Sequence, residues 1–405
     1  MKNVLLIGCA YPPELPYFAR GIAQIGARVY GVDQWPEGNL PPMTKQSLSG
    51  YCQVDSLIDE EKVVETVRRW AGNITFDRIE SLWEPTVLVT ARLREALGVP
   101  GMQYDHVLRF RDKDKMKQAV AAAGLRTPKH ERANSADEAR EGAEKIGFPV
   151  CFKPIAGAGS ENTYRVESME DLEAILKRTP HVDHNVEEWI EAEEYTFDTL
   201  CIDGRAVFEN VSWYRPRPLV GRSNEWISPQ TVTLRDIEAP ELEAGKKLGR
   251  DVLKALDHES GYTHMEWYRK SDGEAVFGEI ACRPPGAHTV DTMNFANDVD
   301  LFRGWASCVI DKKFDVEIER KYNCAIIFKR AQGKGRIQRI DGLDRILASF
   351  GEHIAAMELL PIGAHRRDWV KTLLSDGFVF VRHPDLQATC DMADRVGTDL
   401  QLFAG

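Results

Sequence analysis

The sequence predicts an α/β protein that begins with a parallel sheet and continues into lobes of mixed strands and helices. Three patterns lead to this prediction: short apolar runs alternate with amphipathic segments over the first hundred residues, a glycine-rich loop joins two strands near residue 157, and Asp-Gly steps follow at 203–204 and 272–273. Strands alternating with helices are typical of parallel α/β sheets, and Asp-Gly is the strongest short hairpin signal. A chain of 405 residues, 43% of them hydrophobic, is long enough for two or three lobes.

The first lobe is expected over residues 1–105. Strands are predicted at "NVLLIG", "RVYGVD" and "DRIESLW", and each is followed by an amphipathic segment with helical spacing. The first strand leads into "GCAYPP", where a dinucleotide-binding fold would need G-x-G-x-x-G. The lobe therefore resembles a Rossmann-like parallel sheet that lacks the cofactor motif.

Two further lobes are expected, over residues 106–320 and 321–405. Helices are predicted at about 112–124, 135–146, 168–177 and 240–256, the second of them opening with Ser135 and Glu138 in capping-box spacing. The last lobe returns to mixed strands and helices.

The composition excludes several classes of partner. A formal net charge of −11 and a pI near 5.5 argue against nucleic acid or an anionic membrane surface. No apolar stretch approaches the roughly 20 residues that cross a bilayer. The eight cysteines form no Cys-x-x-Cys pair, so reduced thiols and a cytoplasmic location are expected.

The stretch "THMEWYRKSDGEAVFGEIACR", residues 263–283, sets two carboxylates against each other. If Asp272-Gly273 is a two-residue turn, Glu266 faces Glu279, and directly opposed residues have Cβ atoms about 4.5–5.5 Å apart. Arg283 falls on the same face, while Met265, Trp267, Val276 and Ile280 point to the other, which is expected to be core. Two like charges so close need a cation between them.

A second hairpin serves as a control on this reasoning. The step Asp203-Gly204 would oppose Asp198 and Glu209 in the same way. A carboxylate pair in a hairpin is more often a solvated surface pair than a metal site, so the spacing alone does not decide between the two.

Two other stretches have a chemical and a structural interpretation. Lys153 ends the apolar run "VCFK" before "GAGS", where loop amides and the lysine can hold phosphate oxygens, or where an ordinary turn follows an exposed lysine. "VEEWIEAEEY" is a solvated run of charge, or a hinge strand beside an adenine with a carboxylate on the ribose.

Taken in order, these motifs resemble those of the ATP-grasp superfamily over residues 106–310: an Asp-Lys helix, the strand-end lysine, the Gly-Ser loop, "VEEWI", and then Glu266, Glu279 and Arg283. The resemblance implies an ATP-grasp fold, an N-terminal Rossmann-like lobe and a C-terminal mixed lobe. It also implies ATP and Mg²⁺, with Mn²⁺ as an alternative.

The resemblance implies a role for each matching residue. Lys113 and Lys153 would contact the ATP phosphates, with Lys115 competing for the place of Lys113. Glu266 and Glu279 would hold the metal, and Arg283 would be catalytic. The remaining nucleotide contacts would come from the phosphate-covering loop, the adenine hinge and the ribose carboxylate: Gly157, Gly159, Ser160, Glu187, Glu188, Ile190 and Glu194.

One difference from the ATP-grasp motifs points to a particular branch of the superfamily. Many family members read Glu-x-Asn-x-Arg, with the Asn as a further metal ligand, whereas this chain reads "EIACR" with Ala281 in that place. The Glu-x-small-x-Arg form, "THME" and the extra C-terminal lobe resemble the L-amino acid ligases, the dipeptide-forming branch.

The function that follows is an ATP-dependent carboxylate–amine ligase working through an acyl phosphate on amino-acid-like substrates. Its partners would be small carboxylates and amines, with a homodimer as the possible assembly. Arg215, Arg217 or Arg222 could grip a substrate carboxylate, or could decorate an exposed loop. Two alternatives stay open: carboxyphosphate chemistry, as in carboxylases and formyl transferases of the same fold, and an ATP-binding protein without turnover.

Overall fold

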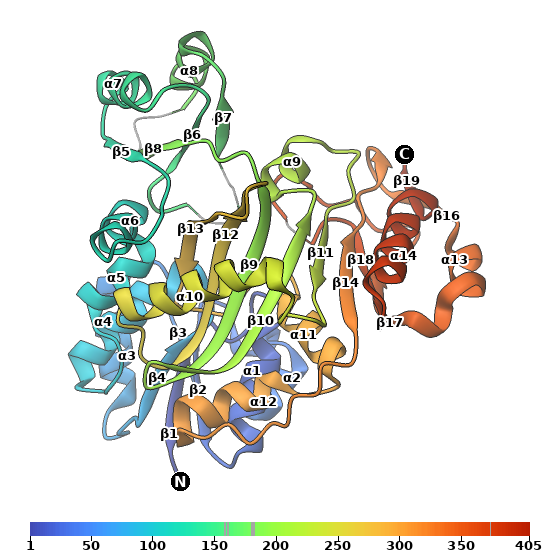
Figure 1. Cartoon of the computed structure of the whole chain (residues 1–405). Coiled ribbons are helices and arrows are strands. Elements are labelled where there is room, and N and C mark those ends of the chain that lie inside the picture. Colours follow the sequence, from blue (N-terminus) through green and yellow to red (C-terminus); the bar gives the residue numbers. More distant parts are fainter. Residues whose placement is uncertain (158, 160–161, 180–182, 373) are drawn as a thin grey trace.

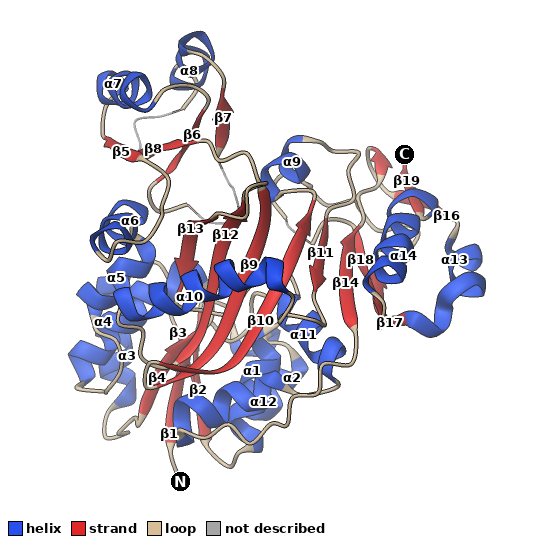
Figure 2. Ribbon diagram, viewed as in Figure 1, coloured by secondary structure: helices blue, strands red, loops and turns tan. Residues whose placement is uncertain are grey.

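The structure is a computed structural model that describes residues 1–405 except 158, 160–161, 180–182 and 373. Its described strands form four sheets. Figure 1 shows the small sheet of β5–β8 standing above one end of the large sheet, with the N-terminal lobe below it. The C-terminal helices α13 and α14 lie beside the far edge of the large sheet, and Figure 2 shows how the helices cover the strands.

The N-terminal lobe is a four-stranded parallel sheet in the order β3-β2-β1-β4. Its elements are β1 Asn3–Ile7, α1 Leu15–Gln24, β2 Arg28–Asp33, η1 Glu37–Asn39, α2 Pro42–Ser47, β3 Leu48–Gln53, α3 Glu60–Ala71, β4 Arg78–Ser81, η2 Glu84–Thr86 and α4 Val87–Leu97. The predicted parallel α/β lobe is confirmed. The sequence analysis missed β3 and α2, because β3 is an edge strand in which only Cys52 is buried and no apolar alternation marks it.

The small sheet is antiparallel, in the order β5-β8-β6-β7. Its elements and the two helices that lead into it are α5 Tyr104–Arg111, α6 Lys113–Ala122, β5 His130–Ala133, α7 Ala136–Ile146, β6 Val150–Pro154, β7 Tyr164–Val166, α8 Met169–Leu176 and β8 His184–Glu188. Ser135 caps α7 by accepting a hydrogen bond from the Glu138 amide, as the capping-box spacing predicts.

The large sheet has the order β13-β12-β9-β10-β11-β14-β18-β17, with antiparallel neighbours throughout. Its strands and covering helices are β9 Glu193–Ile202, β10 Arg205–Arg215, α9 Pro218–Ser223, β11 Gln230–Thr233, η3 Pro240–Leu242, α10 Glu243–Ala255, β12 Gly261–Arg269, β13 Ala275–Ala281, α11 Thr289–Asn297, α12 Leu301–Ala306, η4 Ser307–Asp311, β14 Asn323–Phe328, β17 Ile354–Leu359 and β18 Gly377–His383. Strands from both sides of residue 320 join in this one sheet, and the lobe boundary there stays a prediction.

The rest of the C-terminal segment forms a three-stranded sheet, β15-β19-β16, and two helices. Its elements are β15 Gln332–Gly333, β16 Ile337–Asp341, α13 Leu343–Phe350, η5 Gly351–His353, α14 Leu386–Asp399 and β19 Gln401–Ala404. None of the helices in the described part of the chain has both the length and the apolar character that crossing a membrane requires. All eight cysteines are free.

Two glycines let α10 lie unusually close to the large sheet. A Cβ at Gly245 would come within 2.2 Å of the Trp267 ring, and one at Gly249 within 2.1 Å of Phe197. Contacts under 3.0 Å are not made by real Cβ atoms, so only glycine fits at these two positions. Helix α10 thus covers the apolar face of β12 and leaves the opposite face, which carries Glu266, for the site.

Candidate functional site

The candidate site is a cavity between β6 of the small sheet and strands β9, β12 and β13 of the large sheet. We call it the inner cavity. It brings together six of the residues predicted from the sequence: Lys113, Lys153, Gly157, Glu194, Glu266 and Glu279. Trp189, Arg217 and Tyr268 also line this cavity.

Glu266 faces Glu279 as predicted, although the turn between them differs from the prediction. Near the turn the register is one residue shorter, since Arg269 pairs with Ala275 and the Lys270 amide donates to Glu274 at 3.0 Å. Asp272-Gly273 is therefore part of a three-residue loop. A bulge next to Glu266 restores the register, because Gly278 is the extra residue on β13.

The bulge also corrects the predicted division of faces. Val276 pairs with Tyr268, on the cavity side of the sheet, and Phe277 takes its place in the main core beside Met265 and Trp267. The prediction that Val276 belongs to the opposite face was wrong, because it assumed an unbroken two-residue period across Gly278.

The control hairpin does not oppose its two carboxylates. A register shift between Ala206 and Phe208 sets Asp198 against Asn210 instead of Glu209. Asp198 is fully buried, and its carboxylate lies 2.6 Å from His264 Nδ1. Burial would lower the pKa of His264, but its hydrogen bonds to Asp198 and Glu266 outweigh burial and raise that pKa to about 9. A cationic His264 then lies beside Glu266, with 3.7 Å between Nε2 and the carboxylate.

Two lysines converge on Glu279 from different elements. Lys113 is the first residue of α6, and its Nζ lies 3.4 Å from Glu279 and donates to the Gly157 carbonyl at 2.6 Å. Lys153 comes from β6, with its Nζ 3.7 Å from the same carboxylate. Burial would raise the pKa of Glu279, but Lys113 and Lys153 hold it well below its usual range. Lys115, the competing choice, is exposed on α6.

Behind this pair lies a buried network that the sequence analysis missed. Glu187 lies between Lys117 Nζ at 2.8 Å and Lys153 Nζ at 3.0 Å, and the Lys117 side chain has no exposed surface. Burial would raise the pKa of Glu187, yet the two lysines lower it to about 2. Burial also lowers the pKa of Lys117 to about 8 against the attraction of Glu187. The i, i+4 spacing of Lys113 and Lys117 on one helix face was the available signal.

The other end of the inner cavity is occupied by Arg217. Its Nε donates to Glu194 at 3.0 Å and its Nη1 donates to the Ile190 carbonyl at 2.8 Å. Burial is the largest cause that raises the pKa of Glu194 to about 7, and the charge of Glu266 is the second. Arg217 opposes the shift. Tyr214, another residue that the sequence analysis missed, donates its hydroxyl to Glu266 at 3.1 Å.

Three other predicted residues, Gly159, Glu188 and Arg283, do not line the inner cavity, and a fourth is not among the described residues. The Glu188 carboxylate binds Arg126 at 3.0 and 3.1 Å, away from the cavity lining. Arg283 donates its Nε to Glu84 at 2.8 Å, and Glu84 is a buried residue that the sequence analysis missed. Gly159 has φ +60°, which favours glycine. Ser160 lies outside the described residues.

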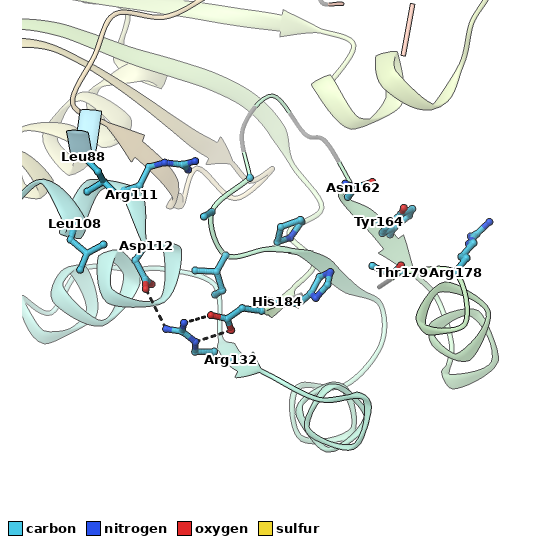
Figure 3. A pocket seen from close by; sticks show the side chains of 15 residues that line it. Leu88, Leu108, Arg111, Asp112, Arg132, Asn162, Tyr164, Arg178, Thr179 and His184 are labelled. Atoms are coloured by element: carbon cyan, nitrogen blue, oxygen red, sulfur yellow. Dashed lines mark hydrogen bonds and ion pairs between the residues drawn. The ribbon is translucent and has the colours of Figure 1, made fainter. Parts of the chain in front are cut away.

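A second and larger cavity, of about 530 Å³, opens on the other side of the glycine loop (Figure 3). Pro154 and Gly157 line both cavities. Arg132 forms an ion pair with Asp112, 3.2 Å away, and donates a hydrogen bond from its Nε to the Asp183 carboxylate (Figure 3). Arg111 lines the same space and lies 3.6 Å from Glu84, which is also the partner of Arg283.

The chemistry of the inner cavity suits a hard cation shared with a nucleotide. Within the described residues, no cluster of three or more His, Cys, Asp or Glu side chains could hold a metal ion alone. Mg²⁺ is usually bound by one or two carboxylates together with phosphate oxygens and water. The facing pair Glu266 and Glu279 fits that pattern, with phosphates required to complete it.

The fold and the cavity define an α/β protein in which two antiparallel sheets enclose a polar cavity beside a parallel lobe. A family model of the ATP-grasp domain matches residues 118–297, and a model of the ATP-grasp N-terminal domain matches residues 24–101. The chain therefore belongs to the ATP-grasp superfamily, and the fold predicted from the sequence is confirmed.

Several relatives are amino-acid ligases. The chain is 28% identical over 251 residues to an L-arginine-specific L-amino acid ligase of Bacillus subtilis, and 24% identical over 267 residues to the alanine–anticapsin ligase of that organism. Each match covers 60% of this chain and 56% of the relative, so the chain matches little more than half the length of either relative. The crystal structure of an L-amino acid ligase from Bacillus licheniformis has a TM-score of 0.83 at 19% identity, over 100% of this chain and 99% of that one.

Proposed function

We propose that the protein is an ATP-dependent ligase that joins a carboxylate to an amine and releases ADP and phosphate. The observation that carries the proposal is the convergence of Lys113 and Lys153 on Glu279, directly opposite Glu266, in a cavity bordered by the glycine loop. The similarity to two amino-acid ligases supports it.

The chemistry follows from the poor reactivity of a carboxylate toward amines. Transfer of the γ-phosphoryl group of ATP to a substrate carboxylate oxygen gives an acyl phosphate and ADP. Attack of the amine then forms the C–N bond, expels phosphate and releases a proton. Such phosphoryl transfer depends mainly on positioning and charge neutralisation.

In this proposal Lys113 and Lys153 bind the phosphate oxygens, and the loop with Gly157, Gly159 and Ser160 covers them. Arg283 stabilises the oxyanion that develops when the amine attacks. Glu266 and Glu279 are the candidate ligands for Mg²⁺, which when bound would neutralise phosphate charge.

The nucleoside end of the site is assigned to β8, β9 and the turn between them. Glu187, Glu188 and Ile190 form the adenine-side hinge, and the Glu194 carboxylate accepts ribose hydroxyls. Glu187 supports the hinge in this assignment by fixing β8, because its carboxylate is held by Lys117 and Lys153 and it pairs with β5 and β6. Glu188 serves through its backbone, since Arg126 holds its side chain.

We assign the substrates to the class of free amino acids or similar small molecules. The relatives are named as an L-arginine-specific and an alanine–anticapsin ligase. The cavity of about 530 Å³ between the glycine loop and Arg111 falls in the range of roughly 300–1,000 Å³ of small-molecule sites. It therefore offers room for such substrates next to the phosphate loop.

The test is a screen of amino-acid pairs with ATP and Mg²⁺, read by phosphate release and by mass spectrometry of the condensed product. Glu279→Gln keeps the shape of the side chain and removes its charge, so it should lose turnover by at least about 100-fold with an unchanged circular dichroism spectrum. Full activity of this variant would refute the role of Glu279.

A second candidate uses carboxyphosphate or formyl phosphate in the same site. It is favoured by 26% identity over 196 residues to a formate-dependent phosphoribosylglycinamide formyltransferase of Methanocella arvoryzae. Phosphate release that needs bicarbonate or formate, and not an amino acid, would establish this alternative. If the protein binds ATP but none of these substrates leads to phosphate release, it is an ATP-binding protein without catalytic turnover.

A further inference from the structure

Arg217 makes the contacts that a bound nucleoside would need. Its guanidinium donates to the Ile190 carbonyl and to the Glu194 carboxylate. The guanidinium carbon also lies 4.6 Å from the centroid of the Trp189 ring and 5.0 Å from that of Tyr268. An adenine would use its exocyclic amine as donor and its ring for stacking, and a ribose would offer hydroxyl donors to a carboxylate.

Arg217 and a bound nucleotide would compete for these groups and for the same space. With Arg217 in place, the inner cavity has only about 50 Å³ of free space, far below the roughly 300 Å³ of a small ligand site. The Arg217 side chain is only 15% exposed, so it fills the cavity and does not lie along its rim.

The segment that carries Arg217 is tied to the C-terminal part of the chain. Arg217 directly precedes α9, and Arg330 Nη1 donates to the carbonyls of Gly221 and Asn224, both at 2.8 Å. Glu225 pairs with Arg366 at 2.9 Å. Residues 216–227, which we call the α9 segment, are therefore held from one side by the C-terminal lobe and from the other by Glu194.

We propose that Arg217 is an internal occupant of the nucleoside end of the site, and that nucleotide binding must displace it together with the α9 segment. This inference rests on the proposed function, because it takes Ile190 and Glu194 as nucleoside contacts. Binding is then coupled to a movement that the C-terminal lobe resists through Arg330 and Arg366.

The arrangement makes a quantitative prediction for nucleotide affinity. When only a fraction of the protein has Arg217 out, the apparent Kd is the intrinsic Kd divided by that fraction. Removing the guanidinium abolishes this competition at Ile190 and Glu194. We expect Arg217→Ala to bind Mg·ADP about tenfold more tightly than the unchanged protein.

The experiment is titration calorimetry of Mg·ADP with the full chain and two variants. Arg215→Ala is the matched control, since Arg215 lies two residues away, pairs with Gln230 and Asp394, and is not part of the inner cavity lining. It should leave the affinity within about twofold. Unfolding curves followed by circular dichroism verify that each variant is folded.

Kinetics supply a second readout that a purely structural role would not change. If Arg217 must leave first, the observed association rate of ADP should level off with concentration in the unchanged protein and rise linearly in Arg217→Ala. Equal or weaker binding by Arg217→Ala would overturn the inference, since Arg217 would then be neutral or a nucleotide ligand. If neither the unchanged protein nor Arg217→Ala binds ADP, the proposed function is overturned as well. The failure of the inference and the failure of the proposed function are thus distinguishable.

Discussion

Glu187→Gln is predicted to remove more stability than any exposed charge in the small sheet. The change replaces a buried carboxylate, 3% exposed, that is paired with Lys117 at 2.8 Å and Lys153 at 3.0 Å. A shift of its pKa from 4.5 to about 2 corresponds to about 3 kcal/mol at neutral pH. Breaking a buried ion pair from one side costs about 3–5 kcal/mol, which agrees with that figure.

The sign of the pH dependence follows from the lowered pKa. A carboxyl whose folded pKa lies below its unfolded value stabilises the fold fully above the unfolded pKa near 4.5, and loses this contribution as the pH falls toward 2. The difference between the unchanged protein and Glu187→Gln should therefore shrink from about 3 kcal/mol at pH 7 to about 2 kcal/mol near pH 3.5.

Urea unfolding followed by circular dichroism at the two pH values measures the effect. Glu131→Gln is the control, because Glu131 lies on the neighbouring strand β5 and pairs with Lys145, a lysine that is 71% exposed. The control should change stability by less than about 0.5 kcal/mol. Equal unfolding curves for the two variants at pH 7 would refute the idea that Glu187 is a required counter-charge.

Three further predictions follow from the packing and the site. Gly245→Ala should cost about 1–3 kcal/mol by overpacking against Trp267, measured by urea unfolding, whereas Gly38→Ala, with nothing within 4 Å of its added Cβ, should be close to neutral. Lys113→Met should weaken Mg·ADP binding at least about tenfold by calorimetry, whereas Lys115→Met should not; the reverse order would favour Lys115 as the phosphate ligand. Arg283→Ala should keep ADP affinity within about twofold but lose product formation by at least about 100-fold, and a variant that ligates normally would exclude Arg283 from the chemistry.

The hairpin of β12 and β13 shows why the sequence could predict a pairing without predicting its cause. The facing of Glu266 and Glu279 was predicted from a two-residue turn, and it arises from a three-residue loop followed by a bulge at Gly278. The two deviations offset each other. A Cβ at Gly278 would lie 2.8 Å from the Glu266 carbonyl oxygen, and that close approach between strands is invisible to a pattern read along one strand.

Contacts between segments that are far apart in the sequence also limit what the sequence can predict about the site. The sequence placed Lys153 and Glu187 in the site but left out Lys117, because its counter-charge lies 70 positions away on β8. Similarly, Arg217 was a candidate for a substrate carboxylate, while the structure joins it to Ile190, in the turn before β9, and to Glu194, within β9. Local periodicity predicts the face of an element, and only the packing of the small sheet on the large one decides what that face meets.

Lys153 lies between two carboxylates that differ in how firmly they are held. Glu187 is fixed by Lys117 and by the amide of Asn185, which donates to it at 2.6 Å, whereas Glu279 is 30% exposed and lies farther from Lys153, at 3.7 Å against 3.0 Å. The charges of Glu187 and Glu279 outweigh the burial of Lys153 and raise its pKa well above the usual value. Because Glu187 lies 3.0 Å from Lys153 and is itself held by Lys117 and Asn185, we expect it to keep Lys153 paired if Glu279 binds another partner. The proposed role of Glu279 as a metal ligand is compatible with this arrangement, since Lys153 would keep Glu187 as its counter-charge.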